Sequence, residues 1–164
     1  MSDDPRQQAF TYQLDMLKLE VEVVNSTIRQ IDDISKSLKE WTVTIWAAGV
    51  GGALVTSGMR RYIWATAAVP LLFWIVDSHH KVVQRRFGWR CLRIMDFLND
   101  DRLARSFEEK RLVDFTVMDL ASRRDRSPGY RRFVSWPNAA FFGTVSLLYL
   151  GLAMISTVVW LLCW

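Results

Sequence analysis

Residues 136–164 read WPNAAFFGTVSLLYLGLAMISTVVWLLCW, a run without one charged side chain. A helix of about 20 predominantly apolar residues crosses the hydrocarbon core of a bilayer, so this run predicts a membrane span. Two further uncharged runs precede it, Trp41 to Met59 and Tyr62 to Val76. The chain as a whole is 51% hydrophobic and 23% charged, which also fits a soluble domain. The segregation of apolar residues into runs therefore decides the fold class: an all-α membrane protein with three transmembrane helices.

The first two runs are separated only by Arg60 and Arg61. As helices they would be roughly 28 Å and 22 Å long, so the second is short for a bilayer. Together they predict an antiparallel transmembrane hairpin over residues 41–76. Pro70 lies inside the second run, where a proline removes a backbone hydrogen bond, and it predicts a kink there.

Basic residues are distributed unevenly around these runs. Of the 21 Lys and Arg residues, 14 fall between residues 77 and 135, against five in residues 1–40 and two at the hairpin tip. Because cytoplasmic segments carry the excess of Lys and Arg, residues 77–135 are expected inside. The predicted organisation is a cytoplasmic helix over 1–40, the hairpin over 41–76, a basic cytoplasmic region over 77–135 and a C-terminal span over 136–164. The N-terminus is then cytoplasmic and the C-terminus outside.

The most regular pattern in the chain precedes the first run. Apolar residues spaced alternately by four and three form a heptad seam that begins at Phe10 and continues through Leu14, Leu17, Val21, Val24, Ile28 and Ile31. A slightly shifted stripe of Ile34, Leu38, Trp41 and Ile45 carries on into the first run. One helix from about residue 10 through Met59 is therefore expected, with its first half clear of the bilayer.

The seam has two interpretations that do not exclude each other. It packs within the chain, against the helical face formed by Val83, Phe87, Cys91, Ile94 and Leu98, or it joins copies of the chain in a coiled-coil oligomer. Packing within the chain is favoured. A second apolar strip of Met16, Leu19 and Val23 allows both kinds of contact at once.

Small residues gather in the first run. Ala48 with Gly52, and Gly49 with Ala53, are pairs four residues apart, a spacing that lets two membrane helices approach closely. The partner is either the second run or a neighbouring subunit, and the pattern favours neither.

Residues 99–135 predict smaller elements. Asn99, Asp100 and Asp101 offer an N-cap and first-turn acids for a short helix through about Lys110. Residues 112–119 alternate apolar and polar side chains, which predicts a strand or extended segment. Residues 121–129 predict a loop, and Pro137 opens the last span.

No motif for catalysis, phosphate cradling or structural zinc is present, so a non-enzymatic protein without cofactor or metal is expected. The two histidines lie in Asp77-Ser78-His79-His80-Lys81. This resembles the Asp-His-His metal motif of phosphoesterases, but Ser78 interrupts it and no further ligand cluster is evident. An ion pair of Asp77 with His80 or Lys81 is favoured, with a proton-sensitive switch as the alternative.

Two basic clusters flank the cytoplasmic region: Lys81, Arg85, Arg86, Arg90 and Arg93 after the second run, and Arg123, Arg124, Arg126, Arg131 and Arg132 before the third. The favoured interpretation is topology and contact with anionic membrane lipids. The sharper alternative is a site for a phosphate-bearing ligand such as a nucleotide second messenger.

Three short phrases carry a resemblance: Ser-Leu-Lys-Glu-Trp at 37–41, Pro-Leu-Leu-Phe-Trp-Ile-Val-Asp at 70–77, and Phe-Leu-Asn-Asp-Asp-Arg-Leu-Ala-Arg-Ser-Phe-Glu-Glu-Lys-Arg-Leu-Val at 97–113. The chain resembles small bacterial multi-span proteins of unassigned chemistry. In plan it is similar to the SLATT-type membrane effectors of bacterial conflict systems, which have two spans where this chain has three predicted ones. The resemblance covers most of residues 8 to 135 and lies in layout and short phrases.

The resemblance implies a homo-oligomer in a bacterial inner membrane that permeabilises the bilayer when a partner sensor is triggered, in antiphage defence. Together with the seam and the small-residue run, it leads us to expect a non-enzymatic membrane effector whose cytoplasmic helices rearrange. The alternative is a membrane anchor or scaffold that docks a cytoplasmic partner protein, either a sensor or an enzyme.

Overall fold

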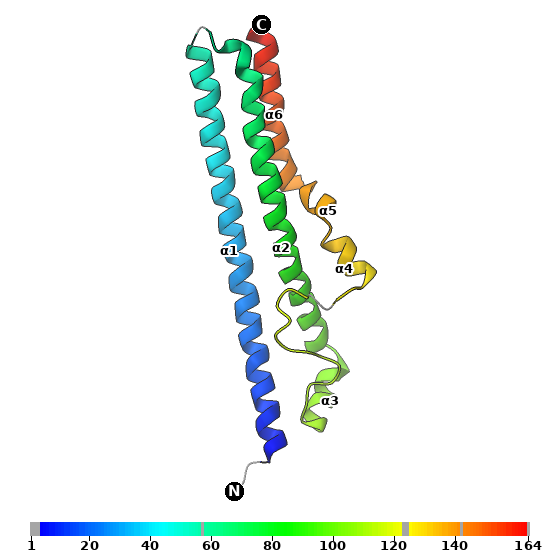
Figure 1. Ribbon diagram of the computed structural model, residues 1–164. Coiled ribbons are helices and arrows are strands. Elements are labelled where there is room, and N and C mark those ends of the chain that lie inside the picture. The colour runs from blue at the N-terminus through cyan, green and yellow to red at the C-terminus, as the bar shows by residue number, and fades with distance from the viewer. Residues whose placement is uncertain (1–3, 57, 123–124, 142, 164) are drawn as a thin grey trace. The chain divides into compact units, whose positions relative to one another are not determined.

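Helices dominate the part of the chain that the structure describes. The computed structural model describes residues 4–56, 58–122, 125–141 and 143–163. Its elements, in chain order, are α1 (Pro5–Val55), the 3₁₀ helix η1 (Arg60–Ala67), α2 (Ala68–Leu98), α3 (Asp101–Glu109), α4 (Pro128–Phe133), α5 (Trp136–Ala140) and α6 (Gly143–Cys163) (Figure 1). No strand occurs within these described ranges, so the all-α prediction is confirmed. The expected long N-terminal helix is confirmed as well, because α1 runs for 51 residues.

For residues 112–119 a strand or an extended segment was predicted, and the strand does not form. This segment is irregular, and Asp114 and Met118 have φ angles of 51° and 63°, in the left-handed region that a strand does not use. Backbone N–H groups at the start of this segment form hydrogen bonds with side chains instead of with a neighbouring strand. The N–H of Val113 donates to Ser106 Oγ, and the N–H of Leu112 donates to Gln13 Oε1.

The short helix predicted after Asn99 is confirmed as α3. Asp100 caps it, because its side chain accepts a hydrogen bond of 3.0 Å from the N–H of Arg102. Asp101 supplies the expected acid in the first turn, and Lys110 ends the helix in the left-handed conformation. The expected loop over 121–129 is shorter than predicted, since α4 begins at Pro128.

The predicted hairpin over 41–76 contains three helical segments, whereas its two uncharged runs predicted two. Helix α1 ends at Val55, η1 follows after a turn, and α2 begins at Ala68. Pro70 is the third residue of α2, where its missing N–H has no intrahelical partner to lose. The structure therefore places Pro70 at the start of a helix instead of at a kink in the middle of one.

One helix in the described part of the chain is long and apolar enough to cross a membrane. It is the stretch Val145–Leu162 of α6, with a mean hydropathy of 2.2. The final run is divided at Phe141 into α5, which has Pro137 in its first turn as expected, and α6. Spans in α1 and α2 are not confirmed by the same measure and stay predictions.

The chain folds into two compact units. Unit 1 comprises Met1–Gln30 and Val83–Phe133, and unit 2 comprises Ile31–Val82 and Val134–Trp164. Unit 1 holds 16 of the 21 Lys and Arg residues and 13 of the 17 Asp and Glu residues. The charged and apolar parts of the sequence therefore correspond to separate units of the fold.

The core of unit 1 forms between α1 and α2, which are antiparallel there. Leu17 packs with Ile94 and Phe97, and Phe97 stacks on Phe115 with 4.3 Å between ring centroids. The heptad seam is thus covered within the chain, as the favoured interpretation requires: Leu17, Val24 and Ile31 are buried, and Leu14, Val21 and Ile28 are half-buried. The predicted partner face is partly wrong, because Phe97 takes the core position and Leu98 is exposed.

Candidate functional site

The 4-3 register of the seam continues past Ile31 through Ser35, Leu38 and Thr42, so two of its next three positions are polar. It places Ser35 and Thr42 on the inner face of α1, and Thr42 is fully buried. The shifted stripe predicted from the sequence is wrong in three of its four positions, because Ile34, Trp41 and Ile45 are exposed. Seam positions in unit 2 therefore carry hydroxyl groups that need hydrogen-bond partners.

Asp77 is the centre of the polar contacts in unit 2. Its side chain is fully buried, although it is a carboxylate. Ser35 Oγ of α1 donates a hydrogen bond of 2.6 Å to Asp77 Oδ1, and the hydroxyl of Tyr149 in α6 donates one of 3.1 Å to Asp77 Oδ2. We call Ser35, Asp77 and Tyr149 the polar hub. Because burial of a carboxylate is costly unless it is hydrogen-bonded, the hub ties three helices together at one point.

The inner face of α6 is a second seam. Val145, Tyr149, Leu152 and Ser156 recur at helical spacing and are all buried. Ser156 forms a second polar anchor, where its hydroxyl oxygen accepts from Trp46 Nε1 at 2.7 Å and from Thr66 Oγ1 at 3.1 Å. The hydroxyl groups of Tyr149 and Ser156, both on the buried face of α6, therefore bond this helix to the other helices of unit 2.

The histidine motif is arranged differently from the favoured prediction. Asp77 bonds to hydroxyl groups on α1 and α6 instead of to His80, because Asp77 lies on the buried face of α2. His79 is exposed, and His80 Nδ1 lies 2.9 Å from the carbonyl oxygen of Val76. The role of the two histidines as a proton-sensitive switch stays a prediction. Within the described ranges no cluster of His, Cys, Asp and Glu could hold a metal ion.

Two arginines of the predicted basic clusters serve the packing of unit 1. Arg90 is buried and makes a bidentate ion pair with Glu20, at 2.8 Å and 2.9 Å. Arg90 also donates to the carbonyl oxygen of Thr116. Arg85 donates to the carbonyl oxygen of Phe133, and burial lowers the pKa of its guanidinium. Both side chains therefore bond to protein groups within unit 1.

The other basic residues divide into three sets. Arg93 and Arg126 line a groove of unit 1. Arg86, Arg131 and Arg132 are exposed and Lys81 is half-buried. Arg123 and Arg124 lie outside the described residues. Contact of any of these side chains with lipid stays a prediction.

The small-residue face of α1 is only partly covered within the chain. A Cβ atom at Gly49 would lie 3.4 Å from Thr66 Cγ2 in η1. A Cβ at Gly52 would meet nothing within 4 Å, Ala48 is exposed, and Ala53 is half-buried. Gly49 thus packs against the segment that follows, whereas Ala48 and Gly52 leave an open strip.

Three residues that matter most were not singled out from the sequence: Glu20, Ser35 and Tyr149. A signal for Glu20 was present, since it lies three residues after Leu17 and four before Val24, on the seam side of α1. Ser35 could have been found by extending the 4-3 register unchanged. Tyr149 gave no comparable signal, because its partner Asp77 is 72 residues away.

No family model, curated protein sequence or solved structure matches the chain. The resemblance to small bacterial membrane effectors therefore stays an expectation based on the phrases at residues 37–41, 70–77 and 97–113.

Proposed function

We propose that this chain is a non-enzymatic, oligomeric effector of a bacterial inner membrane that raises the permeability of the bilayer when its helices rearrange, in antiphage defence. In this proposal α6, the start of α2 and the second half of α1 all cross the bilayer, and unit 1 is cytoplasmic. The observation that carries the proposal is Asp77, a fully buried carboxylate bonded to both α1 and α6.

Asp77 directly follows the second predicted span, so its carboxylate is buried at the cytoplasmic end of the three helices. A buried carboxylate is costly unless it is hydrogen-bonded. The two bonds of Asp77 come from hydroxyl groups, and water can replace a hydroxyl group as donor. If α6 shifts, Asp77 loses the bond from Tyr149 and recruits water in its place. That exchange opens a hydrated path along the inner faces of the three helices.

The outer surface of unit 2 supports placement of all three helices in the bilayer. It exposes large apolar side chains on every long helix: Trp41, Val43, Ile45 and Val55 on α1, Leu71, Leu72, Ile75 and Val76 on α2, and Leu147, Met154, Ile155, Val158, Leu161 and Leu162 on α6. Apolar patches of this extent mark contact with lipid or with another protein. Lipid and neighbouring subunits are the two environments that an oligomeric membrane protein provides.

The test is the leak of a small fluorescent dye from liposomes that contain the purified chain. Tyr149→Phe keeps the ring but removes the hydroxyl that donates to Asp77. The variant therefore lacks the bond that the proposed trigger would break, and no trigger has to be added. We expect the variant to release dye faster than the wild type. Tyr62→Phe makes the same chemical change on an exposed tyrosine of η1 and should leave the leak rate at the wild-type value.

Two results would oppose the proposal. If the wild type and Tyr149→Phe both retain dye at every protein density and pH, the chain does not permeabilise membranes. If the mass of the detergent-solubilised assembly corresponds to one chain, the oligomeric part of the proposal fails.

The surface of unit 1 favours a second function, that of a membrane anchor or scaffold for a cytoplasmic partner. It exposes Tyr12, Leu19, Leu92, Met95 and Phe107, which are large apolar residues in an otherwise charged unit. Such side chains are enriched where proteins bind one another. Stoichiometric co-purification of one soluble partner, together with liposomes that never leak, would favour this function over the first.

A further inference from the structure

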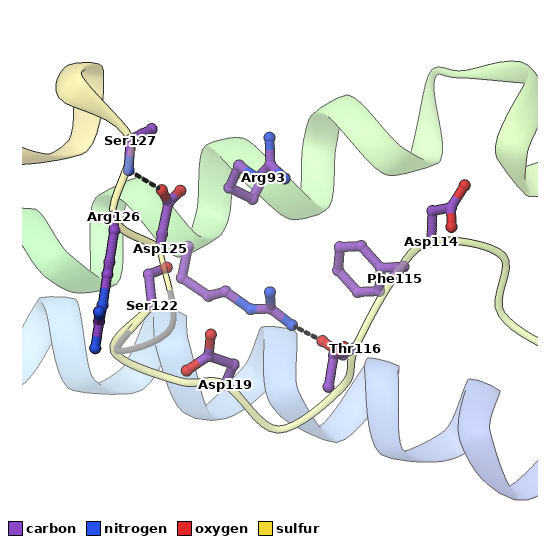
Figure 2. Close-up of a pocket in the computed structure, with 10 residues that line it drawn as sticks. Arg93, Asp114, Phe115, Thr116, Asp119, Ser122, Asp125, Arg126 and Ser127 are labelled. Atoms are coloured by element: carbon purple, nitrogen blue, oxygen red, sulfur yellow. Dashed lines mark hydrogen bonds between the residues drawn. The ribbon is translucent and has the colours of Figure 1, made fainter.

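Unit 1 contains an open groove of about 390 Å³ between α2 and the segment that runs from Asp114 to Ser127. Figure 2 shows Arg93 on α2 on one side of the groove, and Ser122, Asp125 and Arg126 on the segment. Ligand pockets for small molecules begin at about 300 Å³, so the groove suits a compound of mononucleotide size. The groove lies within unit 1 alone, so a ligand could bind there whether or not the chain permeabilises membranes.

Several side chains that line the groove already form hydrogen bonds or ion pairs within unit 1. Arg90 is held by Glu20 and Thr116. Asp125 accepts from Trp89 Nε1 at 2.7 Å and from the N–H of Ser127 at 2.8 Å. These contacts fix the shape of the groove, so it exists before any ligand binds.

Ser122 is an exception among these groups. Its side chain is only 2% exposed, and its Oγ has no hydrogen-bond partner in the described part of the chain. Buried hydroxyl groups are almost always hydrogen-bonded, and an unpartnered one on the wall of a groove is available to bond a molecule that enters the groove. Ser122 lines the groove together with Arg93 and Arg126.

Two guanidinium groups and a hydroxyl donor are the combination that binds a phosphate group. The groove is larger than a phosphate ion, and the carboxylate of Asp114 at its other end accepts hydrogen bonds from hydroxyl or amino groups. We propose that this groove of unit 1 binds a phosphate monoester whose organic part carries hydroxyl or amino donors. Arg93, Arg126 and Ser122 hold the phosphate, and Asp114 accepts from the organic part.

Two sources share this chemistry, a free nucleotide and an inositol lipid whose ring carries a phosphate monoester. The test is calorimetric titration of the purified full chain in detergent with adenosine 5′-monophosphate, inositol 4-phosphate and inorganic phosphate. We expect saturable binding of one ester per chain, tighter than binding of inorganic phosphate. The ester that binds more tightly identifies the source.

Variants then test the assignment of residues. Arg93→Gln and Arg126→Gln should each weaken binding of the ester by about tenfold, the usual loss when a hydrogen bond to a charged group is removed. Arg86→Gln is the matched control, an exposed arginine on the same helix that does not line the groove. Ser122→Ala should weaken all three probes, whereas Asp114→Asn should weaken the two esters and leave inorganic phosphate unchanged.

Circular dichroism spectra equal to that of the wild type establish that each variant is folded. The proposal is overturned if none of the three probes binds saturably up to millimolar concentration. It is also overturned if Arg86→Gln weakens binding as much as Arg93→Gln does, because the interaction would then be with the general positive charge of α2.

Discussion

Glu20 is the side chain that connects the elements of unit 1. Both of its carboxylate oxygens accept from Arg90, and Oε2 also accepts from the N–H of Met118 at 2.8 Å. Arg90 in turn holds the carbonyl oxygen of Thr116. A buried ion pair therefore takes the place of the missing strand partner along residues 116–118.

Replacement of Glu20 by Gln should destabilise unit 1 strongly. Loss of one partner leaves Arg90 buried and uncompensated, which costs about 3–5 kcal/mol in comparable pairs. The measurement is the urea dependence of tryptophan fluorescence in detergent micelles. Glu22→Gln, on an exposed residue two positions away, is the matched control and should change stability little. Equal stability of both variants would contradict the role given to Glu20.

Asp125 makes the segment before α4 sensitive to acid. Burial raises the pKa of this carboxyl, but hydrogen bonds from Ser127 and Trp89 outweigh burial, and Arg93 adds to them, so the net pKa lies below the ordinary 3.8. A carboxyl with a depressed folded-state pKa stabilises the fold above the unfolded-state pKa and loses that contribution as the pH falls through the folded-state value.

We therefore expect the bond from Trp89 to Asp125 to persist from neutral pH to below about pH 4 and to break on further acidification. The indole N–H resonance of Trp89 reports it directly by nuclear magnetic resonance. In Asp125→Asn this resonance should be displaced and independent of pH, whereas Asp114→Asn, on an exposed residue, should leave the wild-type titration intact. A wild-type titration centred above pH 4 would contradict the depressed pKa.

At the scale of elements, periodicity predicted more than composition did. The spacing of Leu17, Val24 and Ile31 was sufficient to predict α1 and its buried face. Residues separated by three or four positions lie on the same face of a helix, so the pattern can be recognised from nearby residues alone. A different pattern, the alternation of Val113, Phe115 and Val117 at every second residue, predicted a strand over 112–119 where the segment is held by side chains from other elements. Alternation predicts a strand only when a second strand is available to pair with it.

The link between Asp77 and Tyr149 could not be predicted in this way. Each residue is a single polar position within an apolar helix, and sequence spacing does not specify which polar positions meet across helices. The all-α class and the longest helix could therefore be predicted from the sequence, whereas the contacts at the centre of the candidate site are evident only in the structure.

The small-residue face of α1 allows a test that separates packing within the chain from packing between chains. Gly49→Leu should weaken unit 2, because its side chain meets Thr66 of η1 at a distance already close to contact. A Cβ atom at Gly52 would meet nothing within 4 Å, so Gly52→Leu should leave the thermal stability of a single chain unchanged. If Gly52→Leu nevertheless reduces the mass of the detergent-solubilised assembly, the strip of Ala48 and Gly52 packs between subunits. An assembly of wild-type mass would exclude that strip as an interface.

At the scale of the whole molecule, the division of charge predicts how the chain lies across a membrane. Unit 1 holds most of the charged side chains, and the uncharged α6 exposes large apolar side chains such as Leu147, Met154 and Leu161. Because segments rich in Lys and Arg remain cytoplasmic, residues 77–135 and the N-terminus should lie on the same side, opposite the C-terminus. An odd number of spans is required for that arrangement.

Single cysteines in a background of Cys91→Ser and Cys163→Ser test this topology in intact cells. A membrane-impermeant thiol reagent should label a cysteine placed after Trp164, and should label cysteines at Gln8 and Phe107 only after the membrane is opened. Gln8 and Phe107 are both exposed, so burial within the protein does not account for protection. A cysteine at Arg61, between the first two runs, decides whether the hairpin crosses. Labelling in intact cells means that three helices span the membrane, whereas protection at Arg61 leaves α6 as the one span and removes the basis for a path through unit 2.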